Sequence, residues 1–156
     1  MDGVTRFTLP GAVALSLLAA AAHAQPRSYA AQSPDGETRI AFAVGEAVTY
    51  AVTHRGQTLL GPSPISLTLD GGRVLGRGAR VSGTRTRQVS ETIRPVVAIK
   101  NATIPDRYTE LRVDFRGGYA LEARAYDDGV AYRWVTSLPD SVTVQAEEGE
   151  AGRGDL

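Results

Sequence analysis

The chain consists of short runs in which apolar and polar residues alternate, with turn-forming residues about every 8–12 positions. Alternation with a period of two places successive side chains on opposite faces of a strand. No segment keeps a helical period for more than about two turns. The pattern therefore predicts an all-β fold, an antiparallel β-sandwich or barrel. The apolar residues of the expected strands include Ile40, Phe42, Val44, Val48, Tyr50, Val52, Leu59, Leu60, Ile65, Leu67, Leu69, Leu111, Val113, Phe115, Val142 and Val144.

Turn signals divide these runs. Ser33-Pro34-Asp35-Gly36 combines a proline, which fixes φ, with a glycine, which accepts a positive φ. Arg55-Gly56 and Asp70-Gly71-Gly72 end later runs in the same way. Between Arg73 and Arg94 the chain is polar and rich in arginine and threonine, which predicts a long edge strand or a strand with a loop.

The first 24 residues have the three-part pattern of a secretory signal peptide. Arg6 precedes an apolar run, and small residues surround the expected cleavage point between Ala24 and Gln25. The run is shorter than the roughly 20 residues of a membrane-spanning helix. The alternative is a buried N-terminal helix. We expect export to the periplasm or the extracellular space of a Gram-negative bacterium, with no membrane attachment after cleavage.

Composition excludes several classes of function. The 156 residues contain 17 basic and 17 acidic side chains, which argues against nucleic-acid binding and against adhesion to anionic membranes. The absence of cysteine excludes a disulfide framework and thiolate chemistry. After cleavage the chain has the length of one ordinary domain, and its core must come from apolar side chains alone.

The stretch AYDDGVAYRW at 125–134 predicts a β-hairpin. An Asp-Gly pair between alternating runs favours a type I′ turn, here with Asp128-Gly129 at the tip. Asp127 would then pair with Val130, and one face would carry Ala123, Ala125, Tyr132 and Trp134 towards the core. The same register places Arg124 opposite Arg133, a like-charge pair that needs an acid nearby, with Glu122 diagonal to it. A three-residue loop avoids that pair but mixes Arg133 into the apolar face.

Three interpretations of Asp127 and Asp128 remain open: they form a structural turn, they contact another domain or a sugar, or they belong to a catalytic or metal site. We favour the turn, because water at a hairpin tip leaves little to raise the pKa of a carboxyl group. Tyr126 lies on the face opposite the core and is the better candidate for contact with a partner domain or ligand. Tyr126, Asp127 and Asp128 are thus the candidate contact residues.

Other acids and the histidine offer no catalytic arrangement. Glu110 flanks an expected strand start, and further glutamates lie in the polar tail. None has an apolar setting that would raise its pKa towards that of a general acid. His54 is the single histidine after cleavage and lies beside the Arg55-Gly56 turn, so a Ser-His-Asp triad and a zinc site are both disfavoured. We assign this chain no catalytic residue, no metal ligand and no cofactor.

Three segments together resemble the N-terminal domain of glycoside hydrolase family 97. They are SPDG with its following strand (33–44), PDRYTELRVDF (105–115) and LEARAYDDGVAYRW (121–134). The resemblance covers nearly all of residues 30–145. The family pattern has Trp-x-Pro-Val and Tyr-Asn-Glu-Leu where this chain has Ile93-Arg94-Pro95-Val96 and Tyr108-Thr109-Glu110-Leu111.

The resemblance implies a plan for a larger enzyme. Family members are exported bacterial α-glucosidases and α-galactosidases with an N-terminal β-supersandwich, a catalytic (β/α)8 barrel and a small C-terminal β domain. The barrel supplies the catalytic carboxylates, and glutamates of the barrel and the N-terminal domain hold a calcium ion. No catalytic or calcium-binding position of the family matches a residue here.

We therefore expect a signal peptide at 1–24, an incomplete sandwich at 25–146 and a polar tail at 147–156. The expected function is that of a non-catalytic N-terminal module that packs on the barrel of the parent enzyme and shapes its sugar pocket, with α-linked oligosaccharide as a possible ligand. The alternative is a free-standing periplasmic carbohydrate-binding or interaction module.

Overall fold

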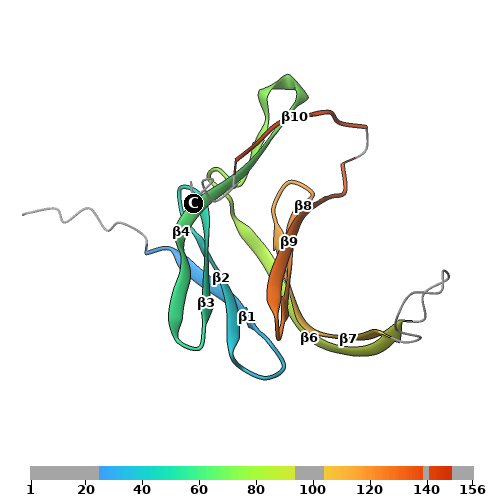
Figure 1. Cartoon of the computed structure of the whole chain (residues 1–156). Helices are drawn as coiled ribbons and strands as arrows, with labels where there is room; N and C mark the ends of the chain where they lie inside the picture. The colour runs from blue at the N-terminus through green and yellow to red at the C-terminus, as the bar shows by residue number, and fades with distance from the viewer. Residues whose placement is uncertain (1–24, 94–103, 139–140, 149–156) are drawn as a thin grey trace, which may run out of the picture.

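The structure, a computed structural model, describes residues 25–93, 104–138 and 141–148. Their strands form two antiparallel sheets that pack face to face as a sandwich (Figure 1). The all-β prediction is thereby confirmed. The expected signal peptide and its cleavage point at Ala24 lie outside the described residues, except for Gln25. No helix in the described ranges could cross a bilayer.

The first sheet has the order β1-β2-β3-β4-β10, with β5 also paired to β4. Its strands are β1 (Arg27–Gln32), β2 (Thr38–Val44), β3 (Val48–His54), β4 (Gln57–Leu69), β5 (Val74–Leu75) and β10 (Val144–Glu148). A 3-10 turn, η1 (Asp70–Gly72), connects β4 to β5. β10 runs two residues past the domain boundary expected at 146.

The second sheet has four strands in chain order. They are β6 (Val81–Ile93), β7 (Ile104–Phe115), β8 (Tyr119–Tyr126) and β9 (Gly129–Thr136). β6 forms one edge of this sheet, as the polar composition of the segment from Arg73 to Arg94 predicted. β1 and β2 of the first sheet lie against β7, β8 and β9 of the second.

The core forms between the two sheets from side chains at alternate positions. Most apolar positions of the expected strands are buried, and Phe42, Ile40 and Ile65 are among the largest fully buried side chains. Leu59, Val142 and Val144, which also lie in apolar runs, are exposed. Tyr132 and Trp134 pack against this core from β9, as predicted. Gly76, in the loop after β5, also lies against the Trp134 ring. Burial of this apolar surface provides the main drive for folding in a chain without disulfides.

Two turns that the sequence predicts are present in the structure. Arg55 and Gly56 connect β3 to β4 and both have positive φ, 50° and 77°, as a type I′ turn requires. The turn Ser33–Gly36 connects β1 to β2, and its Gly36 has φ 79°. Each turn therefore forms where the sequence supplies a residue that tolerates the left-handed region.

The predicted register of the β8–β9 hairpin is wrong by two residues. Tyr126 pairs with Gly129, so Asp127 and Asp128 form the two-residue turn in place of Asp128 and Gly129. None of these three tip residues has positive φ, which excludes a type I′ turn. A shift of two positions keeps every side chain on its face, and the predicted faces are therefore correct.

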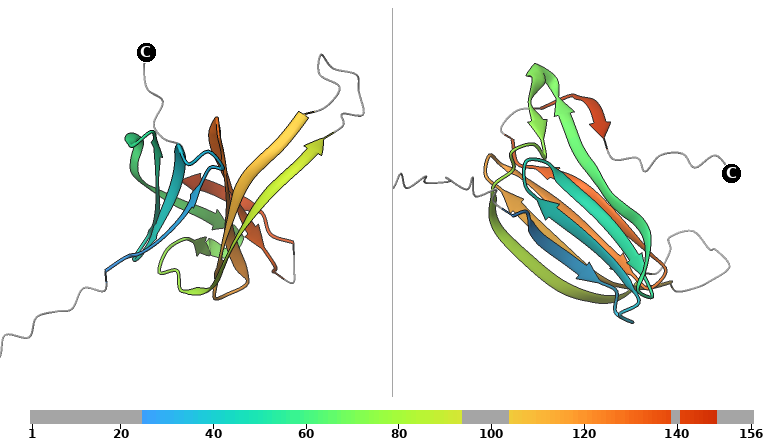
Figure 2. Two further views of the ribbon diagram at one scale, coloured as in Figure 1. Left: turned by 90° about the horizontal axis from the view of Figure 1, so that it is seen from below. Right: turned by 90° about the vertical axis from the view of Figure 1, so that its left-hand side faces the viewer.

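The second sheet extends past the first. Figure 2 shows the far ends of β6 and β7 projecting beyond β1 and β2. Thr84 and Thr86 pair with the buried Val113 and Leu111 and share their inward face, yet both threonines are exposed. The described part of the first sheet therefore leaves this side of β6 uncovered, and its polar side chains suit contact with water or with a polar partner.

Candidate contact surface on the outer sheet face

Asp127 is a structural residue that connects the two sheets. Its Oδ1 accepts a hydrogen bond of 3.0 Å from the backbone N–H of Asp35, although the two residues are 92 positions apart. The Thr38 hydroxyl lies 3.3 Å from the Asp127 carbonyl oxygen. The two turn motifs singled out in the sequence therefore contact each other at one end of the sandwich. Asp128, the other tip residue, is exposed.

The β1–β2 turn is held by its own side chains. Asp35 Oδ1 accepts from the Ser33 hydroxyl at 2.5 Å and from the Glu37 N–H at 2.9 Å. These hydrogen bonds, with that of Ser33 the strongest, lower the pKa of Asp35 below its ordinary value of 3.8. A carboxylate that stays ionised and bonded in this way organises a turn and is a poor proton donor.

His54 belongs to the same turn cluster. Its Nδ1 lies 3.0 Å from the Thr38 hydroxyl oxygen, at the end of β3. The Ser33 hydroxyl donates to Asp35 and accepts from the Thr38 N–H at 2.9 Å, so it does not bond to His54. The arrangement has no serine nucleophile activated by the histidine, which a catalytic triad requires.

The outer face of the second sheet carries two chains of ion pairs that cross the strands. In the first, Glu110 of β7 lies between Arg87 of β6, at 2.7 Å, and Arg124 of β8, at 3.2 Å. Only 5% of Glu110 is exposed. The hydrogen bond from Arg87 is the main reason why the pKa of Glu110 is lowered, and it outweighs the opposing effect of burial.

The second chain runs through Glu122 of β8. Its Oε1 accepts from Arg112 at 2.6 Å, and its Oε2 accepts from Arg133 Nε at 2.8 Å and lies 2.6 Å from Arg133 Nη2. Burial raises the pKa of Glu122, but hydrogen bonds from Arg133 and Arg112 outweigh burial, and the net pKa is lowered. Glu122 lies directly opposite Arg133 in the ladder. The predicted pairing of Arg124 with Arg133 is therefore wrong, and the acid expected nearby is the direct partner.

Aromatic side chains complete this face beside the first chain of ion pairs. The rings of Tyr108 and Tyr126 lie 5.1 Å apart between centroids. The Arg124 guanidinium lies over the Tyr108 ring at 4.4 Å, within the range of a cation–π contact. Tyr126 points to the outer face, as predicted, and its hydroxyl is the largest single cause of the raised pKa of Arg124.

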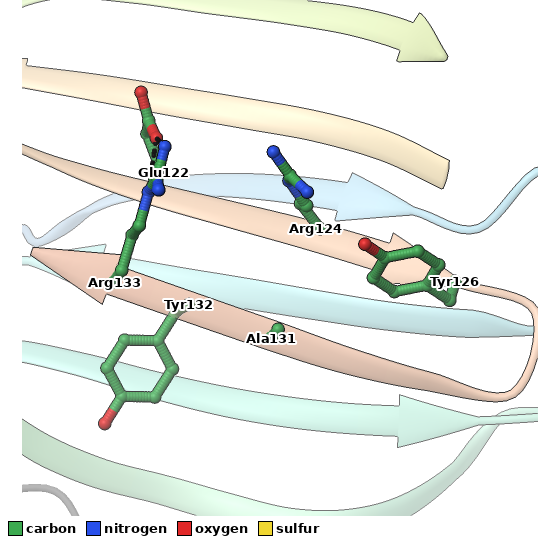
Figure 3. Close-up of a pocket in the computed structure, with 6 residues that line it drawn as sticks. All are labelled: Glu122, Arg124, Tyr126, Ala131, Tyr132 and Arg133. Atoms are coloured by element: carbon green, nitrogen blue, oxygen red, sulfur yellow. Dashed lines mark hydrogen bonds and ion pairs between the residues drawn. The ribbon is translucent and has the colours of Figure 1, made fainter. Parts of the chain in front are cut away.

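A shallow recess of about 170 Å³ opens on the outer face at the β8–β9 edge. Figure 3 shows Arg124 and Tyr126 projecting from β8, Arg133 reaching to Glu122, and Ala131 between them, while Tyr132 points the other way. We call this feature the outer-face recess. Its lining residues are Glu122, Arg124, Tyr126, Ala131, Tyr132 and Arg133.

The groups that line the recess suit ligand binding. Its single carboxylate, Glu122, has a lowered pKa and two arginine partners, whereas a general acid needs a raised pKa. Within residues 25–93, 104–138 and 141–148, no group of three or more His, Asp or Glu side chains could hold a metal ion. What the recess offers a ligand is arginine N–H donors, one tyrosine ring and a small apolar floor.

Sequence reasoning identified Tyr126 on this face but not the two ion-pair chains around it. The alternation of Glu110, Arg112 and Asp114 with buried residues in β7 indicates that they share the outer face. The partner of Glu110 on β6, Arg87, follows from a strand register that the sequence does not specify.

Comparison with known proteins places these features in a family. A family model described as glycosyl-hydrolase 97 N-terminal matches residues 31–151. A retaining alpha-galactosidase of Bacteroides thetaiotaomicron is 38% identical over 109 residues, which are 70% of this chain and 16% of the relative. A probable retaining alpha-galactosidase of Streptomyces bingchenggensis is 36% identical over 137 residues, 81% of this chain and 21% of the relative. The chain thus spans about a fifth of these relatives or less.

Solved structures share the fold. A glycoside hydrolase family 97 enzyme from Pseudoalteromonas sp. strain K8, in complex with panose, superposes with a TM-score of 0.68 at 18% identity, over 77% of this chain and 20% of that one. A beta-arabinopyranosidase superposes with a TM-score of 0.66 at 24% identity, over 77% of this chain and 20% of that one. With the family match across most of its length, this chain belongs to the N-terminal domain family of the glycoside hydrolase family 97 enzymes.

Proposed function

We propose that this chain is a non-catalytic module of an exported family 97 glycoside hydrolase of the α-galactosidase or α-glucosidase class. The observation that carries the proposal is the match of residues 31–151 to the N-terminal domain of that family. In this role the module packs against the catalytic barrel of the parent enzyme and forms one rim of its sugar pocket. Bond cleavage belongs to the barrel.

The structure supports a scaffold role through its rigidity and its uncovered surface. The Asp35–Asp127 hydrogen bond fixes the two sheets at one end, and the paired glutamates stiffen the outer face. The inward side of β6 is polar, and its Thr84 and Thr86 are exposed. We propose this side of β6 as the packing surface for the barrel.

The two largely buried carboxylates of the outer face, Glu110 and Glu122, lack the pKa values of a hydrolytic pair. Glycoside hydrolysis needs one carboxyl group with a raised pKa and a second at a fixed separation. Glu110 and Glu122 both have lowered pKa values. The described residues contain no group of three or more acidic or histidine side chains that could hold a metal ion without ligands from another domain.

The proposal is tested with the purified chain and with the enzyme that contains it. The chain alone should release no nitrophenol from nitrophenyl α-galactoside or α-glucoside. DNA downstream of the Leu156 codon should encode alternating strands and helices, and their product should hydrolyse one of these substrates when this module precedes it. Hydrolysis by the chain alone that Asp127→Asn abolishes, or unrelated downstream sequence, contradicts the proposal.

A free-standing carbohydrate-binding module is the second candidate, and the outer-face recess favours it, because an aromatic ring beside arginine donors suits a sugar. This candidate predicts a measurable heat of binding to α-galactosides or maltooligosaccharides. It also predicts that Tyr126→Ala removes that heat while leaving the thermal unfolding of the chain intact.

A further inference from the structure

The outer-face recess exists because two neighbouring outward positions of β9 are small, beside the long side chain of Arg133. Gly129 pairs with Tyr126, and Ala131 pairs with Arg124. On β7 and β8 the outward positions carry long side chains that cover the sheet, whereas on β9 the floor at Ala131 is exposed. A volume of about 170 Å³ at the sheet edge is therefore open to a small ligand.

The charged lining of this recess favours an anion. Two arginines and one glutamate line it, and both carboxylate oxygens of Glu122 already accept from arginines. Arg133 is the most accessible of the three, with 67% of its side chain exposed. A guanidinium has five N–H donors, and the ion pairs of Arg133 and Arg124 leave several of them for a ligand.

Tyr126 adds a surface for a sugar ring. Its ring is half-buried against Tyr108 and forms one wall, and its hydroxyl raises the pKa of the neighbouring Arg124. Aromatic faces pack against the C–H groups of a ligand, and the planar guanidinium fork matches a carboxylate in two parallel hydrogen bonds. A ligand that contacts both the arginine side chains and the Tyr126 ring carries a carboxylate on a small ring with hydroxyl groups.

We propose that the outer-face recess binds the carboxylate of an acidic sugar, a hexuronate unit, through Arg124 and Arg133, with the sugar ring against Tyr126. This inference goes beyond the proposed function, because it does not depend on the activity of a parent enzyme or on binding of neutral α-linked sugars. It assigns the outer face a ligand distinct from the barrel partner proposed for β6.

Calorimetric titration of the purified chain tests the proposal with four probes: galacturonate, glucuronate, galactose and acetate. At least one uronate should bind. Galactose, which lacks the carboxylate, and acetate, which lacks the sugar ring, should each bind about tenfold more weakly or not at all. Binding should weaken as sodium chloride is raised. Amide resonances of Gly129 and Ala131 should shift during the titration, which locates the ligand.

Variants at the recess and away from it separate the site from general charge. Arg133→Gln should weaken uronate binding about tenfold, and Arg133→Lys should also weaken it, because lysine lacks the planar fork. Arg85→Gln removes the same charge from an exposed position on β6 and should leave binding unchanged. Circular dichroism melts confirm that each variant folds.

Each alternative result overturns the inference in a recognisable way. Acetate binding as tight as uronate binding identifies a simple anion site, and equal galactose binding identifies a neutral sugar site. Equal loss in Arg85→Gln indicates dependence on net charge. If no uronate binds, the proposed uronate site is disproved. The activity of a parent enzyme, tested separately, still decides the proposed function.

Discussion

The backbone N–H of Asp35 donates a 3.0 Å hydrogen bond to Oδ1 of Asp127, and this bond joins the β1–β2 turn to the β8–β9 turn. Each turn belongs to a different sheet. The bond therefore fixes one end of the sandwich independently of core packing. It also gives a structural role to one of the two adjacent aspartates, whose side chain accepts a hydrogen bond from the second turn.

Replacement of Asp127 by alanine removes this acceptor and should lower the free energy of unfolding by about 1 kcal/mol. Asp127→Asn keeps an oxygen at the same place and should stay close to the wild type. Urea denaturation measures both, and hydrogen exchange at the Asp35 amide should speed up in the alanine variant alone.

Asp128→Ala is the matched control for this prediction. Asp128 is the exposed neighbour in the same turn, and its change should stay within about 0.5 kcal/mol. If Asp128→Ala destabilises the chain as much as Asp127→Ala does, the turn itself matters and the bond between the turns does not.

The comparison of sequence and structure in this hairpin shows what a period of two can specify. Alternation placed Tyr132 and Trp134 in the core and Tyr126 outside, and these faces are correct. Alternation cannot tell a register from one shifted by two residues, since both put the same side chains on the same face. The Asp-Gly signal favoured the wrong one of the two.

Long-range contacts decided the true register. In it Glu122 lies opposite Arg133 and pairs with it, and Asp127 reaches the turn at Asp35. Neither contact is encoded in the local turn preference. The partnership of Glu110 with Arg87 likewise depends on the pairing of β6 with β7, so sequence reasoning found the outer face but not its ion-pair chains.

Glu110 should make the stability of the chain depend on acid. Hydrogen bonding from Arg87, with further help from Arg124, lowers its pKa in the folded state below the ordinary 4.5. As the pH falls below 4.5, the unfolded chain therefore takes up a proton before the folded chain does, and stability is lost down to the folded pKa. Above that range the contribution is fully present.

Glu110→Gln should consequently lower the free energy of unfolding at pH 7 by about 1–2 kcal/mol, because two arginines lose their counter-charge. Its stability should also fall less steeply than that of the wild type below pH 4.5. Thermal melts between pH 3 and pH 7 (about one melt per half unit) measure this. Glu91→Gln, an exposed acid on β6, should match the wild type, and an equal change there would disprove the role of Glu110.

Two small effects on stability act in opposite directions at Arg55 in the Arg55-Gly56 turn. Arg55 has φ 50°, a left-handed conformation that asparagine adopts more readily than arginine. Its side chain also forms an ion pair of 2.8 Å with Glu37, but both side chains are well exposed. Exposed pairs contribute little, so the backbone effect should prevail.

Arg55→Asn in a Glu37→Gln background should raise the free energy of unfolding by about 0.5–1 kcal/mol. In the wild-type background the gain should be smaller by the value of the ion pair, about 0.2–0.5 kcal/mol. A double-mutant cycle with urea denaturation separates the two quantities. A loss of stability in the Glu37→Gln background would show that the turn does not strain Arg55.

Of the glycines in the described ranges, Gly76 is the one at which a side chain would be tolerated least. It has φ 92°, and a Cβ atom there would lie 2.7 Å from the Ile65 carbonyl oxygen and 3.2 Å from Trp134 Cη2. The first contact is with backbone inside β4, which cannot move without disturbing the sheet. Gly71, by contrast, has φ 72° with nothing within 4 Å of such a Cβ.

Gly76→Ala should therefore cost about 3 kcal/mol or more, whereas Gly71→Ala should cost only the backbone strain of about 1–2 kcal/mol. Trp134 is the single tryptophan of the chain, so its fluorescence reports directly on the ring that the new methyl group displaces. In Gly76→Ala the emission should shift to the red before the global unfolding transition, and in Gly71→Ala it should not. Equal costs in the two variants would mean that φ alone constrains Gly76 and that the loop packs less tightly against β4 and β9 than the distances indicate.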